Sequence, residues 1–148
     1  MTAQTEVAML PDFAISVTGD PAPQGSKRHV GNGRMIEASA KLPDWRTAVA
    51  LQTRAAMKDQ KWDGYGEHVP VRVVLTFRLK RPTSLPKITK RHARKPDLDK
   101  LIRSTMDALT ICGLLWDDGQ VFRIEAVKTY AGPGEDTGCS IFTWRAER

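Results

Sequence analysis

Cysteine is scarce in this chain of 148 residues, which contains only Cys112 and Cys139. Two cysteines without a C-x-x-C pair cannot build a disulfide scaffold, a zinc ribbon or a thioredoxin-type redox site. The three histidines are scattered without metal-ligand spacing, and the sequence contains neither an H-E-x-x-H pattern nor a G-x-S-x-G elbow. A zinc-protease site and an acyl-transfer site are therefore not supported.

Long apolar runs are also missing. The longest, residues 108–116, is interrupted by Thr110 and Gly113 and is about half the length needed to cross a bilayer. The N-terminus has no basic stretch followed by an apolar one, so it does not resemble a secretory signal. The glycines lack dinucleotide-binding and P-loop spacing. We therefore expect a cytoplasmic protein with no membrane partner and no nucleotide cofactor.

Acidic residues are absent from residues 80–95, a segment that we name the basic arm. Its cations are Lys80, Arg81, Lys87, Lys90, Arg91, Arg94 and Lys95. The whole chain has 23 lysines and arginines against 17 aspartates and glutamates, a net charge of +6. A solvated loop is one interpretation of the arm, but charge this concentrated favours a mobile segment that moulds to phosphates. A polyanionic partner is therefore expected.

Hydrophobic periodicity predicts a single α+β domain at residues 13–148, preceded by a flexible tail at residues 1–12. Expected strands cover residues 13–18, 69–79, 120–130 and 139–145, and expected helices cover residues 44–61 and 97–111. The clearest strand is 69–79, in which apolar residues occupy every second position. Residues 21–40 suggest a basic loop or ribbon, with a hairpin-turn signal at residues 31–33. The order favours a small two-layer domain in which two main helices pack on a mixed β-sheet.

Two acidic pairs flank the second expected helix. Asp97 and Asp99 directly follow the basic arm, and Asp117 and Asp118 follow the helix. Each pair has a structural explanation, because an aspartate at a helix start caps free N–H groups and Asp-Asp-Gly is a common turn sequence. Alternatively, Asp97 and Asp99 converge if the helix begins only at residue 98 or 99. The two pairs then meet only if a return strand brings Asp118 back beside the helix start.

Carboxylates that converge repel one another and need a positive counterpart. Mg²⁺ or Mn²⁺ meets this need, because hard cations bind carboxylate oxygen and water. These ions also activate water and stabilise charge on a phosphodiester. Acidic residues surrounded by arginine and lysine are therefore typical of a metal-dependent nuclease.

Three segments of the chain resemble the RusA family of Holliday-junction resolvases. They are GDPAPQGSKR at residues 19–28, KPDLDKLIRSTMDAL at 95–109 and GLLWDDGQV at 113–121. They follow in the order and spacing of the family, and the resemblance covers most of the chain from Phe13 to Trp144. It implies a RusA-like fold and a homodimer with two active sites. It also implies a Mg²⁺-dependent endodeoxyribonuclease that cuts four-way DNA junctions by paired symmetric nicks, in recombination and repair.

By position, the resemblance implies that Asp97, Asp99 and Asp118 bind the metal ion and act in catalysis, with Asp117 as a weaker ligand. Arg103, one turn after Asp99, would contact the scissile phosphate. The cations expected to hold the DNA are Lys27, Arg28, Arg34, Lys87, Lys90, Arg91, Arg94, Lys95 and Lys100. The chain departs from the family at Lys100, where asparagine is common, and at Arg103, where lysine is usual.

Two other functions fit the same sequence. A protein without catalytic activity could bind branched DNA through the basic surface, with its aspartates serving only as caps and turns. A less selective nuclease for branched DNA is the third interpretation. Composition alone does not separate these three functions.

Overall fold

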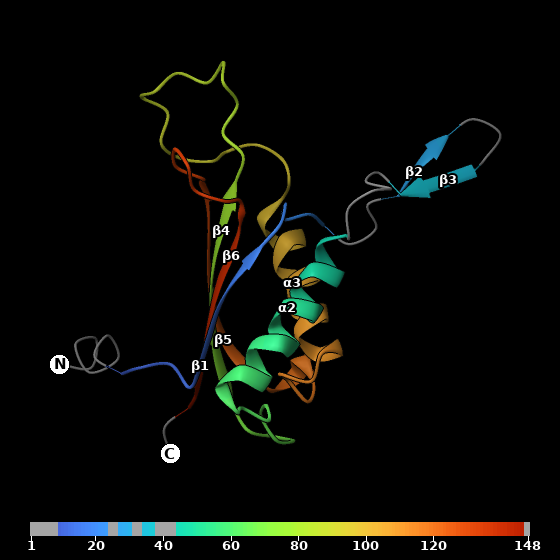
Figure 1. Cartoon of the computed structure of the whole chain (residues 1–148), viewed down its shortest axis with the longest axis vertical. Helices are drawn as coiled ribbons and strands as arrows, with labels where there is room; N and C mark the ends of the chain where they lie inside the picture. Colours follow the sequence, from blue (N-terminus) through green and yellow to red (C-terminus); the bar gives the residue numbers. More distant parts are fainter. Residues whose placement is uncertain (1–8, 24–26, 31–33, 38–43, 147–148) are drawn as a thin grey trace.

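The computed structural model describes residues 9–23, 27–30, 34–37 and 44–146. The elements follow in the order β1 (Phe13–Thr18), β2 (Lys27–Val30), β3 (Arg34–Glu37), α2 (Trp45–Gln60), β4 (Val71–Leu79), α3 (Leu98–Ile111), the short 3-10 helix η1 (Asp118–Gln120), β5 (Val121–Tyr130) and β6 (Gly138–Arg145). Four strands form a mixed sheet in the order β1-β6-β4-β5. Both helices lie on one face of this sheet (Figure 1). The predicted α+β fold is confirmed.

The strands β2 and β3 form a separate antiparallel ribbon that extends away from the sheet (Figure 1). The ribbon carries Lys27, Arg28 and Arg34, as expected for the basic segment. The hairpin-turn signal at residues 31–33 lies outside the described residues, and so do residues 1–8 of the predicted tail. The described end of that tail contacts β6, because the backbone N–H of Asp12 donates to the carbonyl of Thr143 at 2.9 Å.

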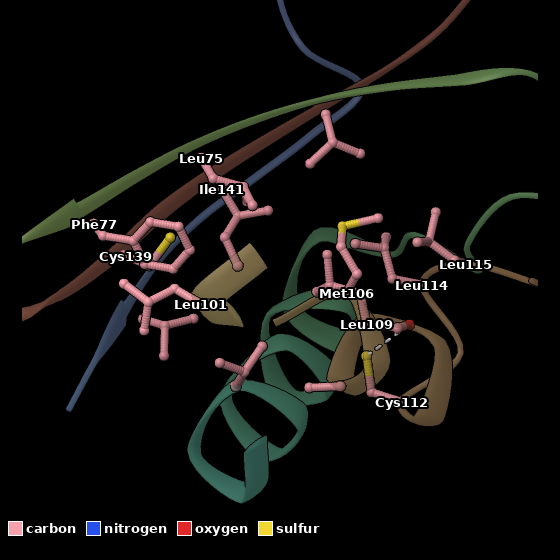
Figure 2. Packing of buried hydrophobic residues seen from close by; sticks show 14 of the residues in the cluster. Leu75, Phe77, Leu101, Met106, Leu109, Cys112, Leu114, Leu115, Cys139 and Ile141 are labelled. Atoms are coloured by element: carbon pink, nitrogen blue, oxygen red, sulfur yellow. Dashed lines mark hydrogen bonds between the residues drawn. The ribbon is translucent and has the colours of Figure 1, made fainter. Parts of the chain in front are cut away.

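The core lies between the sheet and the two helices. In β4, the side chains of Val71, Val73, Leu75, Phe77 and Leu79 are all buried on the helix-facing side. Figure 2 shows Leu75 and Phe77 beside Ile141 and Cys139 of β6, with Leu101 and Leu109 on the helix side. Burial raises the pKa of the Cys139 thiol to about 12, so this cysteine is a packing residue. Neither described helix combines the length and apolar character needed to cross a membrane.

The helix α2 begins and ends with clear local signals. The carboxylate of Asp44 accepts a hydrogen bond from the backbone N–H of Thr47 at 2.8 Å, and this bond lowers the pKa of Asp44. At the other end, Lys61 adopts a left-handed conformation with φ 55°. Inside the core, the indole N–H of Trp45 donates to the hydroxyl of Thr105 at 2.9 Å, which joins α2 to α3.

The unit β4-α3-β5 determines which residues share an end of the domain. The strands β4 and β5 are parallel neighbours, so the chain must cross back through α3 between them. The basic arm and the start of α3 therefore lie at one end of the sheet, whereas η1 and the start of β5 lie at the other (Figure 1). The end of β5 returns to the level of the basic arm.

We expect Gly64→Ala to destabilise the fold. Gly64 has a φ of 89°, and an added Cβ would collide with the carbonyl oxygen of Gly113. The N–H of Tyr65 donates to the carbonyl of Leu114 at 2.9 Å, and this bond holds the backbone at Gly64 close to the backbone at Gly113. The left-handed conformation and the clash together cost about 2 kcal/mol or more, which lowers Tm by roughly 4–8 °C in thermal unfolding.

Gly66→Ala is the matched control for this prediction. A Cβ at Gly66 would meet only the Val69 side chain, at an ordinary contact distance of 3.9 Å. Its Tm should stay close to that of the wild type. Equal Tm values for the two variants would contradict the proposed backbone constraint at Gly64.

Candidate active site

The start of α3 presents Asp97 without using it as a helix cap. The helix begins at Leu98, so Asp97 keeps an extended backbone, and its side chain makes no capping hydrogen bond. The carboxylate instead accepts a hydrogen bond from Lys95 Nζ at 2.7 Å and lies 3.5 Å from Lys100 Nζ. The hydrogen bond from Lys95 lowers the pKa of Asp97, so the carboxylate is ionised at neutral pH.

Asp99 and Arg103 are exposed one turn apart on the same helix. Among the described residues, neither side chain has a hydrogen-bond or ion-pair partner. An anion and a cation that face water without partners are free to contact a ligand. Asp99 therefore joins Asp97 as a candidate metal ligand, and Arg103 is a candidate phosphate ligand.

Asp117 has the structural role that its turn sequence suggests. Its carboxylate accepts a hydrogen bond from the N–H of Gly119 at 2.9 Å. In return, the side-chain oxygen of Gln120 accepts from the N–H of Asp117 at 3.2 Å, which completes a capping box around η1. Capping therefore occupies one carboxylate oxygen of Asp117, the residue expected to be the weaker metal ligand.

Asp118 lies at the opposite end of α3 from Asp97 and Asp99. It lines a surface pocket of about 240 Å³ together with Arg46 of α2 and Asp107, Thr110 and Ile111 of α3. Its carboxylate is exposed and has no hydrogen-bond or ion-pair partner among the described residues. Asp118 is therefore free to bind a ligand but stands beside the last turn of the helix.

The two acidic pairs do not meet within one chain. The axial rise from Asp99 to Thr110 is about 16 Å, whereas a divalent cation holds its oxygen ligands within about 2.6 Å. Among the described residues, no three histidine, cysteine or acidic side chains lie close enough to share a metal ion. Asp118 stays far from Asp97 because it lies in η1, directly before β5, and β5 runs parallel to β4. The strand therefore begins beside Asp118 and only its far end reaches the start of α3.

The return strand brings Lys128 to the start of α3 instead of Asp118. Lys128 Nζ donates to the carbonyl oxygens of Arg94 at 2.6 Å and Pro96 at 3.0 Å. These bonds fix the backbone on both sides of Lys95, directly before Asp97. Lys128 was not among the site residues predicted from the sequence. A signal was present, because Ile124, Ala126 and Lys128 alternate on the helix-facing side of β5 and only the last of them is charged.

The basic arm forms a loop without helix or strand that makes hydrogen bonds within itself. The guanidinium of Arg81 donates to the carbonyls of Thr89 at 2.8 Å and Pro86 at 2.6 Å, and the Leu85 side chain is buried. The ring of His92 lies against the ring of Tyr130, with centroids 4.6 Å apart. The other cations of the basic arm are exposed: Lys80, Lys87, Lys90, Arg91, Arg94 and Lys95.

Exposed cations on a folded loop form a fixed positive surface beside Asp97 and Asp99. Because few of them are used in internal contacts, the surface can neutralise an extended anion such as a phosphate backbone. The acidic residues are therefore candidate ligands for a divalent cation, and the positive surface is a candidate contact for a phosphodiester.

Comparison with protein families identifies a match over most of the chain. The family model described as Endodeoxyribonuclease RusA matches residues 18–136. This range begins at the last residue of β1 and includes the ribbon, both helices, the basic arm, both acidic pairs and β5. No curated protein sequence matches the chain.

Proposed function

The chain belongs to the RusA endodeoxyribonuclease family, and we propose that it is a Mg²⁺-dependent nuclease that resolves four-way DNA junctions by paired nicks. The observation that carries this proposal is a pair of carboxylates at the start of α3, neither of which makes a capping hydrogen bond, beside the positive surface of the basic arm. Asp97 is ionised and pairs with Lys95 and Lys100 instead of capping the helix, and Asp99 is exposed with no partner among the described residues. A purely DNA-binding protein with capping aspartates would explain Asp117 but not these two residues. Recombination and repair are the processes in which such cutting is used.

We propose that the protein is a homodimer joined along β5. The outer edge of this strand pairs with no other described strand. Exposed apolar side chains lie on both of its faces, because Ile124 pairs with Val73 on the helix side and Val127 pairs with Thr76 on the open side. Phe122 adds a further exposed ring. An unpaired apolar edge favours association, and a second copy covers both faces at once.

A two-fold axis across β5 completes the metal site. Symmetric strands pair antiparallel, so the start of β5 in one copy lies beside the end of β5 in the other. Asp118 precedes the start of β5, and Lys128 near its end contacts the backbone next to Asp97. The pairing thus carries Asp118 of the second copy towards Asp97 and Asp99 of the first. Each dimer would then contain two equivalent centres.

The residues of this composite centre have separate tasks. Asp97, Asp99 and Asp118 of the second copy supply carboxylate oxygens, which suit Mg²⁺ or Mn²⁺. When bound, the cation activates water for attack on phosphorus and offsets the charge that develops on the phosphodiester. Arg103 holds the scissile phosphate through its planar guanidinium. The ribbon cations and the basic arm position the DNA backbone, and they respond to its shape more than to its sequence.

Cleavage of a synthetic four-way junction tests the proposed function directly. The wild-type chain should cut the junction in Mg²⁺, and EDTA should stop cutting while binding persists. Binding should weaken steeply with salt, with a log–log slope of about 0.9 for each phosphate contacted. Binding without cutting in any divalent metal would instead support a DNA-binding protein with no nuclease activity.

We expect Lys128→Met to slow cutting without weakening junction binding. The methionine keeps much of the side-chain length but loses both hydrogen bonds to the backbone at Arg94 and Pro96. Groups that orient metal ligands typically change metal affinity or activity by about 10–100-fold. The cutting rate should therefore fall by at least about tenfold and require more Mg²⁺.

Lys128→Arg is the matched control, because its guanidinium can still donate to carbonyl oxygens. It should recover most of the rate at the wild-type Mg²⁺ concentration. If both variants lose activity in proportion to a lowered Tm, the role of Lys128 is general stability and not positioning.

A further inference from the structure

A second surface pocket lies beside η1 and is not used by the proposed chemistry. Its volume is about 450 Å³, and it is lined by Glu67, His68, Trp116, Asp117, Gly119 and Gln120. Trp116 is 63% exposed, although tryptophan is usually buried for most of its surface. It precedes the Asp117-Asp118 pair directly in the sequence. A large exposed ring at this position calls for a functional explanation.

The two walls of the pocket are fixed to each other by one side chain. The amide oxygen of Gln120 accepts hydrogen bonds from the backbone N–H groups of Trp116 at 2.6 Å and Asp117 at 3.2 Å. Its amide nitrogen donates to the carbonyls of Gly66 at 2.8 Å and Val69 at 2.9 Å. The backbone that carries Trp116 is therefore held against the loop that carries Glu67 and His68. A preformed pocket reduces the ordering cost of binding a ligand.

The side chains of the pocket select the kind of ligand that fits. An exposed indole offers a flat surface for stacking, and every nucleobase has a matching face. The carboxylates of Glu67 and Asp117 repel a phosphate but can accept hydrogen bonds from base N–H groups. The pocket thus suits a base and not a stretch of backbone.

We propose that this pocket binds one unstacked nucleobase of the DNA substrate, with the Trp116 indole as the stacking surface. The proposal rests on the proposed function in two respects, because it takes DNA as the ligand and Asp118 as part of the cutting centre. Trp116 is two residues from Asp118, so the bound base belongs to a nucleotide close to the phosphate that is cut. Bases next to a branch point unstack at lower cost than bases inside a duplex, because their stacking is already disturbed. The pocket then favours open, branched DNA over an intact duplex.

The test measures base binding without metal and without cutting. The full-length chain in EDTA is titrated with a short oligodeoxyadenylate and with an abasic oligomer that has the same number of phosphates. Stacking should quench tryptophan fluorescence only with the base-bearing oligomer, which should bind about tenfold more tightly. Trp116→Ala should lose the quenching and the tenfold preference but bind the abasic oligomer as the wild type does.

Trp144→Phe is the matched control, because Trp144 packs outside this pocket, with the Arg72 guanidinium 4.6 Å from its ring centroid. This variant should keep both the quenching and the base preference. Equal affinity of the wild type for the two oligomers would overturn the proposal, as would an unchanged preference in Trp116→Ala. If Trp116 fluorescence instead changes with protein concentration and not with oligomer concentration, the ring lies in a contact between copies of the chain, and the proposal is wrong. None of these results depends on whether the chain cuts DNA.

Discussion

The Asp99→Asn variant is expected to bind a four-way junction as the wild type does and to cut it at least about 100-fold more slowly. Asp99 is exposed in the first turn of α3 and has no partner among the described residues, so its replacement disturbs no internal contact. Asparagine keeps the size of the side chain but removes the negative charge that a divalent cation requires. The loss should exceed that caused by changes in groups that only orient a ligand.

Cutting is measured under single-turnover conditions in Mg²⁺, and binding is measured by gel shift in EDTA. Asp59→Asn is the matched control, because Asp59 is an exposed aspartate on α2 and its replacement causes the same change of net charge. This control should cut at the wild-type rate. Wild-type cutting by Asp99→Asn would remove the metal site at the start of α3 from the proposal.

Two inactive variants are expected to restore cutting when they are mixed. In the proposed dimer, Asp99 and Asp118 of the same centre come from different copies. A mixed dimer of Asp99→Asn and Asp118→Asn chains therefore contains one centre without either replacement and one with both. After random exchange of subunits, about a quarter of all centres are intact. Activity rises from background to a level that is easily measured, and each active dimer nicks one strand.

The control is a mixture of Asp99→Asn with Asp97→Asn, both at the start of α3. These replacements fall in the same half of the centre, so no mixed dimer contains an intact centre. The mixture should remain inactive. If the Asp99→Asn and Asp118→Asn chains also fail to complement, although subunit exchange is confirmed by labelled chains, the composite centre is excluded.

Local sequence patterns predicted much of the fold because they follow directly from burial. The alternation in residues 69–79 corresponds to the buried face of β4, and the apolar stripe of residues 98–109 faces the core from α3. The sequence pattern predicted a helix from residue 97, with a start at 98 or 99 as the alternative, and α3 begins at Leu98, two residues after the proline at residue 96. These features depend on neighbours in the sequence.

The placement of Asp118 could not be predicted in the same way. It depends on whether β5 pairs parallel or antiparallel with β4, a long-range choice that residues 121–130 do not encode by themselves. The same uncertainty concealed Lys128, whose partners are backbone carbonyls and therefore have no side-chain signature. Capping was the structural explanation for Asp97 and a turn was that for Asp117, yet it is Asp117 that makes a capping hydrogen bond, because Gln120 three residues later completes its capping box.

The length of α3, which separates Asp118 from Asp97 and Asp99, has a consequence for the conditions under which the proposed nuclease cuts DNA. In the proposed dimer, a single chain would supply the start of α3 to one catalytic centre and Asp118 to the other, and it would complete neither by itself. Under this proposal, cutting activity would arise only when two chains associate, and it would arise in both centres together. Dilution would abolish cutting by dissociating the dimer, without any inhibitor. Association of two chains would supply both centres needed for a pair of nicks.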